Sequence, residues 1–319
     1  MAIPESSGQL GLLALVGPTA TGKTETGVLV ARALDGEVVS ADSMYLYRGM
    51  DVATAKPTAE ERRGVLHHLV DILDPDEPFS VAEYKVRAEA AIDRILARGR
   101  VPILVGGSGL YVRAVVSPTS FTRVPPDRAL RERLTAEAER DGTEALHARL
   151  AQADPDAAVH IAPRDRKRII RALEVYLSTG QPISQLQALD RERSPRYNTC
   201  RFGLTLPREE LYRRIDERVE RQLAGGLVEE VERLLAEGYR ENLVSMKGLG
   251  YAQIARFLRG VCSLEEAVVQ LKRDTRRFAK RQLTWFRADT SITWLDMRTV
   301  GGPAGATNLI VAEWRQGWA

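Results

Sequence analysis

The stretch Gly17–Gly27, which reads GPTATGKTETG, decides the fold because its first eight residues match the pattern G-x-x-x-x-G-K-[ST]. This pattern is typical of a phosphate-binding loop. Its glycines permit a tight wrap, its main-chain N–H groups face phosphate oxygens, and Lys23 adds a positive charge. The Thr24 hydroxyl is a candidate ligand for Mg²⁺. A glycine turn with an incidental lysine is the alternative, and the flanking sequence argues against it.

Strands and helices are predicted to alternate in roughly the first 115 residues. An apolar run leads into the loop, which predicts a buried parallel strand, and a helix is expected over 23–33. The run GEVVSADS predicts a second strand ending at Asp42, and VPILVGG predicts a third ending in two glycines. A helix is predicted between them, with one apolar face formed by Val86, Ala90, Ile92 and Ile95. This alternation predicts a parallel α/β sheet.

The sequence changes in character near Ser117. From there the chain is rich in charged, helix-forming residues interrupted by DGT, ADPD and STGQP, until NTCRFGLTL indicates a return to the sheet. Helices are predicted within 207–238 and over 263–287, followed by a short last strand, SITWLD. We therefore expect a P-loop NTPase-like α/β core of residues 1–117 and 199–319, its parallel sheet flanked by helices, with an inserted all-helical domain at 118–198.

Composition excludes several classes of protein. The 319 residues include 46 basic and 43 acidic side chains, a balance too even to indicate a polyanionic partner by itself. Cys200 and Cys262 lack disulfide or metal-type spacing and are interpreted as reduced thiols. The N-terminus lacks the basic segment of a signal peptide, and no apolar run reaches membrane-spanning length. We expect a cytoplasmic protein without a membrane partner.

The acid that usually accompanies a phosphate loop is missing. Nucleotide hydrolases and kinases of this type end another buried strand in an aspartate that helps to hold Mg²⁺. Here the candidate strand ends in Gly106 and Gly107, and the acid placed at the mouth of the sheet is Asp42. Asp42 is therefore a candidate for chemistry, and a turn or N-cap aspartate is the alternative.

An arginine interrupts the apolar face of the helix predicted after Pro207. Leu211, Ile215 and Val219 form the apolar stripe, and Arg218 falls at its edge. A guanidinium at a buried boundary needs an anion. Arg218 is therefore either a clamp on phosphate, which arginine matches in a bidentate manner, or one half of a structural salt bridge.

Basic residues gather in two predicted helices, and the second also carries aromatic residues. Such stripes suit a nucleic-acid backbone and unpaired bases, whereas a solvated helix face is the alternative for each cluster alone. The first cluster consists of Arg164, Arg166, Lys167, Arg168 and Arg171, and the second of Lys272, Arg273, Arg276, Arg277, Lys280, Arg281 and Arg287.

Eight segments, in this order, make the sequence similar to the bacterial tRNA dimethylallyltransferase (tRNA isopentenyltransferase) family. They are GPTATGKT, SADSMYLYRGMDVATAKP, HHLVDILDP, VPILVGGSGLYVRA, RIIRALEVY, RIDERV, KGLGYAQ and AKRQLTWFR. The resemblance implies transfer of a dimethylallyl group from dimethylallyl diphosphate to the N6 amine of adenosine 37, beside the tRNA anticodon. It also implies Mg²⁺ as cofactor, and the anticodon stem-loop of tRNA as partner. We expect a monomer.

The resemblance also implies roles for individual residues. Asp42 would accept a proton from the adenine amine or orient it, and Arg218 would pair with the departing diphosphate. Ser108, where many members carry threonine, would lie at the reaction channel, and Lys23 completes the catalytic set. The diphosphate site would consist of Gly17, Pro18, Thr19, Ala20, Thr21, Gly22, Lys23 and Thr24. The tRNA-binding residues would be Asp42, Ser43, Met44, Tyr45, Lys167, Arg168, Ile169, Ile170, Arg171, Lys247, Gly248, Leu249, Gly250, Tyr251 and Ala252.

Two enzymes of the same fold remain as alternatives, an adenine-nucleotide isopentenyltransferase and a P-loop nucleotide kinase. The basic insertion argues against both. An RNA-binding NTPase that switches with ATP is a third alternative, and the missing aspartate argues against it.

Overall fold

The computed structural model describes residues 11–118 and 124–317, which divide into two compact units. One unit contains Met1–Val116 and Arg196–Ala319, and the other contains Ser117–Pro195. The predicted insertion, 118–198, differs from the second unit by one residue at its start and three at its end.

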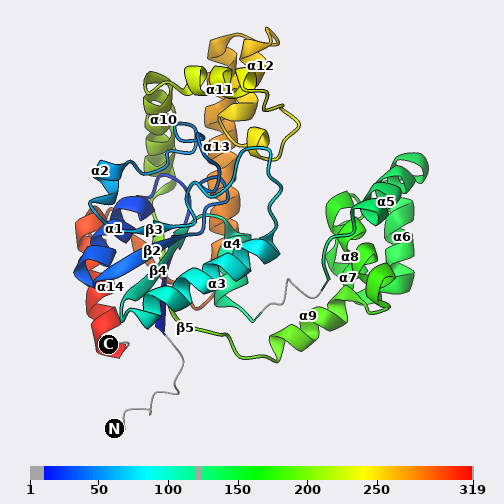
Figure 1. Cartoon of the computed structure of the whole chain (residues 1–319), viewed down its shortest axis with the longest axis horizontal. Coiled ribbons are helices and arrows are strands. Elements are labelled where there is room, and N and C mark those ends of the chain that lie inside the picture. The colour runs from blue at the N-terminus through cyan, green and yellow to red at the C-terminus, as the bar shows by residue number, and fades with distance from the viewer. Residues whose placement is uncertain (1–10, 119–123, 318–319) are drawn as a thin grey trace. The chain divides into compact units, whose positions relative to one another are not determined.

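The first unit is built on a six-stranded parallel sheet with strand order β3-β2-β4-β1-β5-β6. This confirms the predicted α/β fold, with helices around the sheet (Figure 1). The strands are β1 (Gly11–Val16), β2 (Gly36–Ser40), β3 (His67–His68), β4 (Val101–Gly106), β5 (Asn198–Thr205) and β6 (Thr293–Asp296). β1 lies between β4 and β5, so the loop that follows it opens at the middle of the sheet.

Helices pack on the sheet because the side chains of its strands are apolar on both faces. Leu13 and Leu15 of β1 belong to a buried cluster that also contains residues of α1 (Lys23–Ala33) and α14 (Gly302–Gly317). Successive side chains of a strand alternate, so the equally buried Leu12 and Ala14 face the other side. α3 (Val81–Ala97) and α4 (Gly109–Val116) contact β4 and one another.

The apolar face predicted for α3 is partly wrong. Ile92 and Ile95 are buried as expected, but Val86 is 56% exposed and Ala90 is also exposed. The observed stripe begins at Tyr84, which is fully buried and donates a hydrogen bond of 2.9 Å to the Ser40 carbonyl oxygen. Val86 lies about 200° around the helix from Tyr84, so the face that buries Tyr84 exposes Val86.

A group of helices stands beside the sheet and carries part of the candidate site. The stretch predicted at 207–238 contains α10 (Arg208–Ala224) and α11 (Leu227–Ala236), which separate at two glycines. η1 (Ser245–Lys247), α12 (Tyr251–Leu258) and α13 (Leu264–Arg287) follow. α13 packs against α10 and α12 (Figure 1). The sequence patterns did not predict α12, α14 or the short α2 (Ala59–Arg62).

The second unit is all-helical, with its own core. Its helices are α5 (Arg128–Asp141), α6 (Thr143–Ala153), α7 (Pro155–His160), α8 (Arg166–Thr179) and α9 (Ile183–Arg191). Leucines of α5 and α6 pack with Ile169 and Leu173 of α8. Within the described parts of the chain, no helix combines the length and apolar character needed to cross a membrane.

Candidate active site

The phosphate loop ends at the N-terminus of helix α1. Gly22 precedes α1 with φ of 90°, and no described side chain caps the helix. Gly17 touches β5, where a Cβ atom would lie 2.4 Å from the carbonyl oxygen of Leu204. The Lys23 ammonium donates to the Pro18 carbonyl oxygen at 2.6 Å, which folds its side chain back over the loop. Uncapped N–H groups and a lysine form an anion site.

Five side chains from three parts of the chain interact at this loop. Burial lowers the pKa of Lys23 to about 7; the carboxylate of Asp42 opposes this shift and the positive charge of Arg218 adds to it. Burial raises the pKa of Tyr45 to about 12, and the negative charge of Asp42 also raises it. The charge of Arg218 and a hydrogen bond with Thr24 lower it. Burial is the main cause of both shifts, and the charges of Asp42 and Arg218 act on both groups as smaller contributions.

The segment after β2 is held to the turn after β4. The Ser108 hydroxyl accepts a hydrogen bond from the Ser43 N–H at 3.0 Å, and the Ser108 N–H donates to the Ala41 carbonyl oxygen at 3.1 Å. A Cβ atom at Gly106 would lie 2.2 Å from that same oxygen. This contact explains the missing acid, because the close approach of Ala41 leaves no space for a side chain at the end of β4.

Asp42 takes part in the turn that it begins. Its Oδ1 accepts a hydrogen bond of 2.9 Å from the Met44 N–H. Its Oδ2 accepts none from the residues that the structure describes. The turn role weighed from the sequence is therefore real, and it engages Oδ1 of the carboxylate.

Arg218 reaches the site from α10 and is held by a main-chain oxygen. Its Nη2 donates to the carbonyl oxygen of Thr54 at 2.7 Å. Across residues 11–118 and 124–317 no carboxylate forms an ion pair with it, so the structure gives no support to the salt-bridge alternative. One turn later, Gln222 donates to the carbonyl oxygens of Val52 and Ala53 at 3.1 and 2.6 Å.

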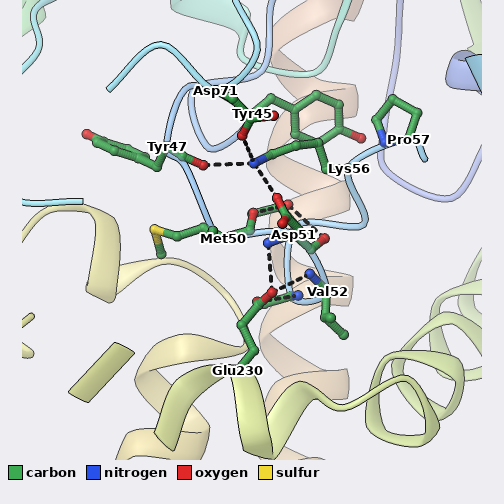
Figure 2. A network of polar contacts seen from close by, with 12 residues as sticks. Tyr45, Tyr47, Met50, Asp51, Val52, Lys56, Pro57, Asp71 and Glu230 are labelled. Carbon is green, nitrogen blue, oxygen red and sulfur yellow. Dashed lines mark hydrogen bonds and ion pairs between the residues drawn. The ribbon is translucent and has the colours of Figure 1, made fainter. Parts of the chain in front are cut away.

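The segment 51–56 that receives these bonds is also held through its N–H groups. Glu230 of α11, only 8% exposed, accepts hydrogen bonds from the N–H groups of Asp51 and Val52 at 2.8 Å each (Figure 2). It also accepts from the N–H of Ala53 at 3.2 Å and from the Tyr251 hydroxyl at 2.7 Å. Three consecutive N–H groups and a hydroxyl thus satisfy a buried carboxylate.

Lys56 closes the other end of this segment. Its ammonium donates to the Tyr47 carbonyl oxygen at 2.8 Å and to the carboxylates of Asp51 and Asp71 at 2.5 Å each (Figure 2). Neither Lys56 nor Glu230 was among the residues predicted for the site. Helical spacing could have indicated Glu230, since it shares a face with Leu227 and Leu234. Lys56 has no comparable signal, because it lies outside any helix or strand.

Part of the predicted tRNA-binding set faces the protein interior. Ile169 and Ile170 belong to the core of the helical unit, and Tyr251 is fully buried with its hydroxyl on Glu230. Apolar packing and this hydrogen bond engage the three side chains within the protein, and the assignment of these residues to tRNA stays a prediction. Lys167 and Lys247 are exposed.

The basic clusters are partly neutralised. In the helical unit Arg164, Arg166 and Arg168 have carboxylate partners at 3.3, 3.3 and 3.4 Å. These pairs are exposed and contribute little to stability, so phosphates can replace their partners. Arg171 is held more firmly, by the carboxylate of Glu174 at 2.7 Å and the Val124 carbonyl oxygen at 2.9 Å. On α13, the exposed basic residues include Arg273, Arg277, Lys280, Arg281 and Arg287.

Thr24 is the residue of this site that the sequence predicts as a ligand for Mg²⁺. No group of three or more His, Cys, Asp or Glu side chains within the described residues has the arrangement of a metal site. Mg²⁺ commonly keeps several waters and is bound by few protein groups together with substrate phosphates. The Thr24 hydroxyl in the first turn of α1 fits this mode.

Comparison with known proteins identifies relatives over nearly the whole chain. The family model described as IPP transferase matches residues 45–289. The chain is 55% identical to the tRNA dimethylallyltransferase of Desulforudis audaxviator over 305 residues, 96% of this chain and 98% of that protein. It is 52% identical to that of Symbiobacterium thermophilum over 310 residues, 97% of each chain.

Solved structures resemble it as well. The full-length tRNA isopentenylpyrophosphate transferase of Bacillus halodurans gives a TM-score of 0.70 at 43% identity, covering 96% of this chain and 97% of that one. A eukaryotic dimethylallyltransferase acting on tRNA gives 0.77 at 25% identity, covering 97% of this chain and 76% of that one.

Proposed function

Because the chain belongs to the IPP transferase family, we infer that it transfers a dimethylallyl group from dimethylallyl diphosphate to the N6 amine of adenosine 37 in tRNA. In this reaction a bond forms between the amine nitrogen and the allylic carbon, and the bond between that carbon and the diphosphate oxygen breaks. The amine loses a proton and diphosphate leaves. The observation that supports the assignment at this site is that the Lys23 ammonium lies on the phosphate loop, bonded to the Pro18 carbonyl oxygen, where the charges of both Asp42 and Arg218 act on it.

We propose that the phosphate loop and Arg218 stabilise the diphosphate as it departs. The N–H groups at the start of α1 and the Lys23 ammonium bind its oxygens, and the Arg218 guanidinium adds a second positive charge. A bound diphosphate would favour the charged form of Lys23, whose pKa burial has lowered to about 7. Mg²⁺ on the Thr24 hydroxyl would supply further neutralisation of the diphosphate charge.

Asp42 is proposed to act on the acceptor. Its Oδ2 can accept a hydrogen bond from the adenine N6 amine, and this bond would orient the nitrogen toward the allylic carbon. The carboxylate would then receive the proton that the amine loses. Ser108 would keep this carboxylate in place, because its hydroxyl binds the N–H of Ser43, the next residue. An adenine base must leave its stack to reach such a group.

Among the residues of the predicted tRNA-binding segments, the exposed ones are proposed to contact tRNA with their side chains. Lys167, Arg168 and Lys247 can reach phosphates with their side chains, and the segment Lys247–Ala252 can also offer main-chain groups. The anticodon stem-loop is the proposed RNA partner, and the protein is proposed to act as a monomer.

A nucleotide kinase is the second candidate of the same fold. The 2.2 Å approach of the Ala41 carbonyl oxygen to a Cβ at Gly106 argues against it, because the usual Mg²⁺-binding aspartate has no space there.

Incubation with unmodified tRNA, Mg²⁺ and dimethylallyl diphosphate labelled in the allyl group tests the function. We expect label in tRNA and stoichiometric release of diphosphate. ATP hydrolysis or phosphoryl transfer without label in tRNA would contradict the proposal. Replacing the tRNA by adenosine monophosphate tests the small-molecule alternative, and we expect no labelled product.

A further inference from the structure

One buried side-chain amide of α13 forms hydrogen bonds with both the phosphate loop and the turn after β4. Gln282 is 6% exposed. Its Oε1 accepts a hydrogen bond from the Thr19 N–H in the phosphate loop at 2.9 Å. Its Nε2 donates to the carbonyl oxygen of Gly107 in the turn after β4, also at 2.9 Å. Thr19 belongs to the predicted diphosphate site, and Gly107 precedes Ser108.

The turn after β4 is shaped to receive this helix. A Cβ atom at Gly107 would lie 2.2 Å from Nε2 of Gln282, and one at Gly109 would lie 2.3 Å from the indole ring of Trp285. A side chain at Gly107 would displace the amide of Gln282, and one at Gly109 would displace the indole ring of Trp285. Glycine at these two positions therefore permits the amide of Gln282 to reach the main chain of the turn.

The two hydrogen bonds also argue against a direct contact between Gln282 and a substrate. One donor and the acceptor of its amide are engaged by protein groups, and the side chain is buried, so it is not placed to contact a substrate. The Thr19 N–H is likewise directed to Gln282. The diphosphate site that we propose therefore relies on the loop N–H groups that follow Thr19.

We propose that Gln282 is a positioning residue that sets the distance between the diphosphate loop and the Asp42–Ser108 turn. Ser108, which follows Gly107, is hydrogen-bonded to Ser43. A shift of Gly107 would therefore also move the segment that carries Asp42. Transfer requires the amine and the allylic carbon to be close to reacting distance, and a displacement of about 1 Å lowers rates on the order of 100-fold. This inference rests on the proposed function.

Gln282→Met tests it, because methionine has a similar length and forms neither bond. We expect kcat for transfer to fall about 10- to 100-fold, while the Kd values for tRNA and dimethylallyl diphosphate change less than about threefold. Gln270→Met is the matched control on the same helix. Its amide donates to Asp274 at 2.8 Å, away from the loop, and we expect wild-type kcat.

A second variant separates positioning from folding. Gln282→Glu keeps an acceptor for Thr19 but replaces the donor to Gly107, and we expect a similar loss of kcat with tRNA bound at full stoichiometry. Wild-type kcat in Gln282→Met would overturn the inference. So would a loss of kcat that only matches the loss of folded, tRNA-binding protein. If the folded wild-type protein transfers no label, the proposed function fails instead.

Discussion

The Arg218 guanidinium donates a hydrogen bond of 2.7 Å to the Thr54 main-chain carbonyl oxygen, so its position is fixed without neutralising its charge. We expect Arg218→Ala to lower kcat about 100- to 1,000-fold, because the charge that is proposed to stabilise the departing diphosphate is lost. Steady-state kinetics of label transfer would measure this. Arg214→Ala on the same helix is the control, since Arg214 pairs with Glu210 at 2.8 Å. Wild-type kinetics in Arg218→Ala would limit Arg218 to a structural role.

Asp42 combines a turn hydrogen bond with the proposed proton transfer, and two substitutions separate them. Asp42→Asn keeps an oxygen that can accept from the Met44 N–H, whereas Asp42→Ala removes it. We expect both to lower transfer about 100- to 10,000-fold, because neither supplies a base. Filter binding should show that tRNA affinity is largely retained. Normal transfer by Asp42→Asn would remove the carboxylate from the mechanism.

The Ser108 hydroxyl accepts a hydrogen bond from the Ser43 N–H and donates to the Ser43 hydroxyl at 3.3 Å. Ser108→Ala leaves the Ser43 N–H without this acceptor, and we expect kcat to fall about tenfold, which corresponds to about 1.4 kcal/mol. Ser108→Thr retains the hydroxyl and should restore most of the rate. Equal rates for the alanine and threonine variants would show that the hydroxyl is dispensable.

Tyr251 and Glu230 connect the proposed RNA segment to the loop that holds Arg218. We expect Tyr251→Phe to cost about 1 kcal/mol of folding free energy, because one buried hydrogen bond is lost. Glu230→Ala removes the acceptor of three N–H groups and should cost more, about 3 kcal/mol. Urea denaturation measures both. Glu229→Ala, an exposed neighbour, should stay within about 0.5 kcal/mol of wild type. Equal costs for Glu229→Ala and Glu230→Ala would contradict this account.

The helical unit contains a buried carboxylate with pH-dependent consequences. Burial acts to raise the pKa of Glu174, but hydrogen bonds from Arg131, Arg171 and the Asp127 N–H outweigh it, so the net pKa is lowered. A lowered folded-state pKa contributes stability above the unfolded value of about 4.3, and that stability is lost as pH falls through the folded value.

Glu174→Gln should therefore destabilise the helical unit at pH 7 by about 3 kcal/mol, and the difference from wild type should shrink below about pH 4. Hydrogen exchange of peptides from α5 and α8 measures this unit separately. Glu132→Gln is the control, since that side chain is exposed. A difference that does not change with pH would rule out the charge as its origin.

Local patterns predicted the elements that depend on local physics. The helix expected over 23–33 is present with those bounds, and the three predicted N-terminal strands are present. Parallel strands place their carboxyl ends at one edge, which is why the position of Asp42 at the mouth of the sheet could be anticipated. The exposed Val86 and the buried Tyr251 could not, because helical spacing alone does not say which side of a helix packs against the rest of the protein.

The sequence by itself determined that a phosphate loop follows a buried strand, that Asp42 stands at the mouth of the sheet, and that Arg218 lies at the edge of an apolar face. Only the tertiary structure decided that Gln282 joins Thr19 to Gly107 and that Glu230 holds the loop at Asp51. The physical reason is range. Periodicity and loop patterns report on neighbours within a few residues, whereas these bonds join residues 263, 175 and 179 positions apart and depend on how the helices pack.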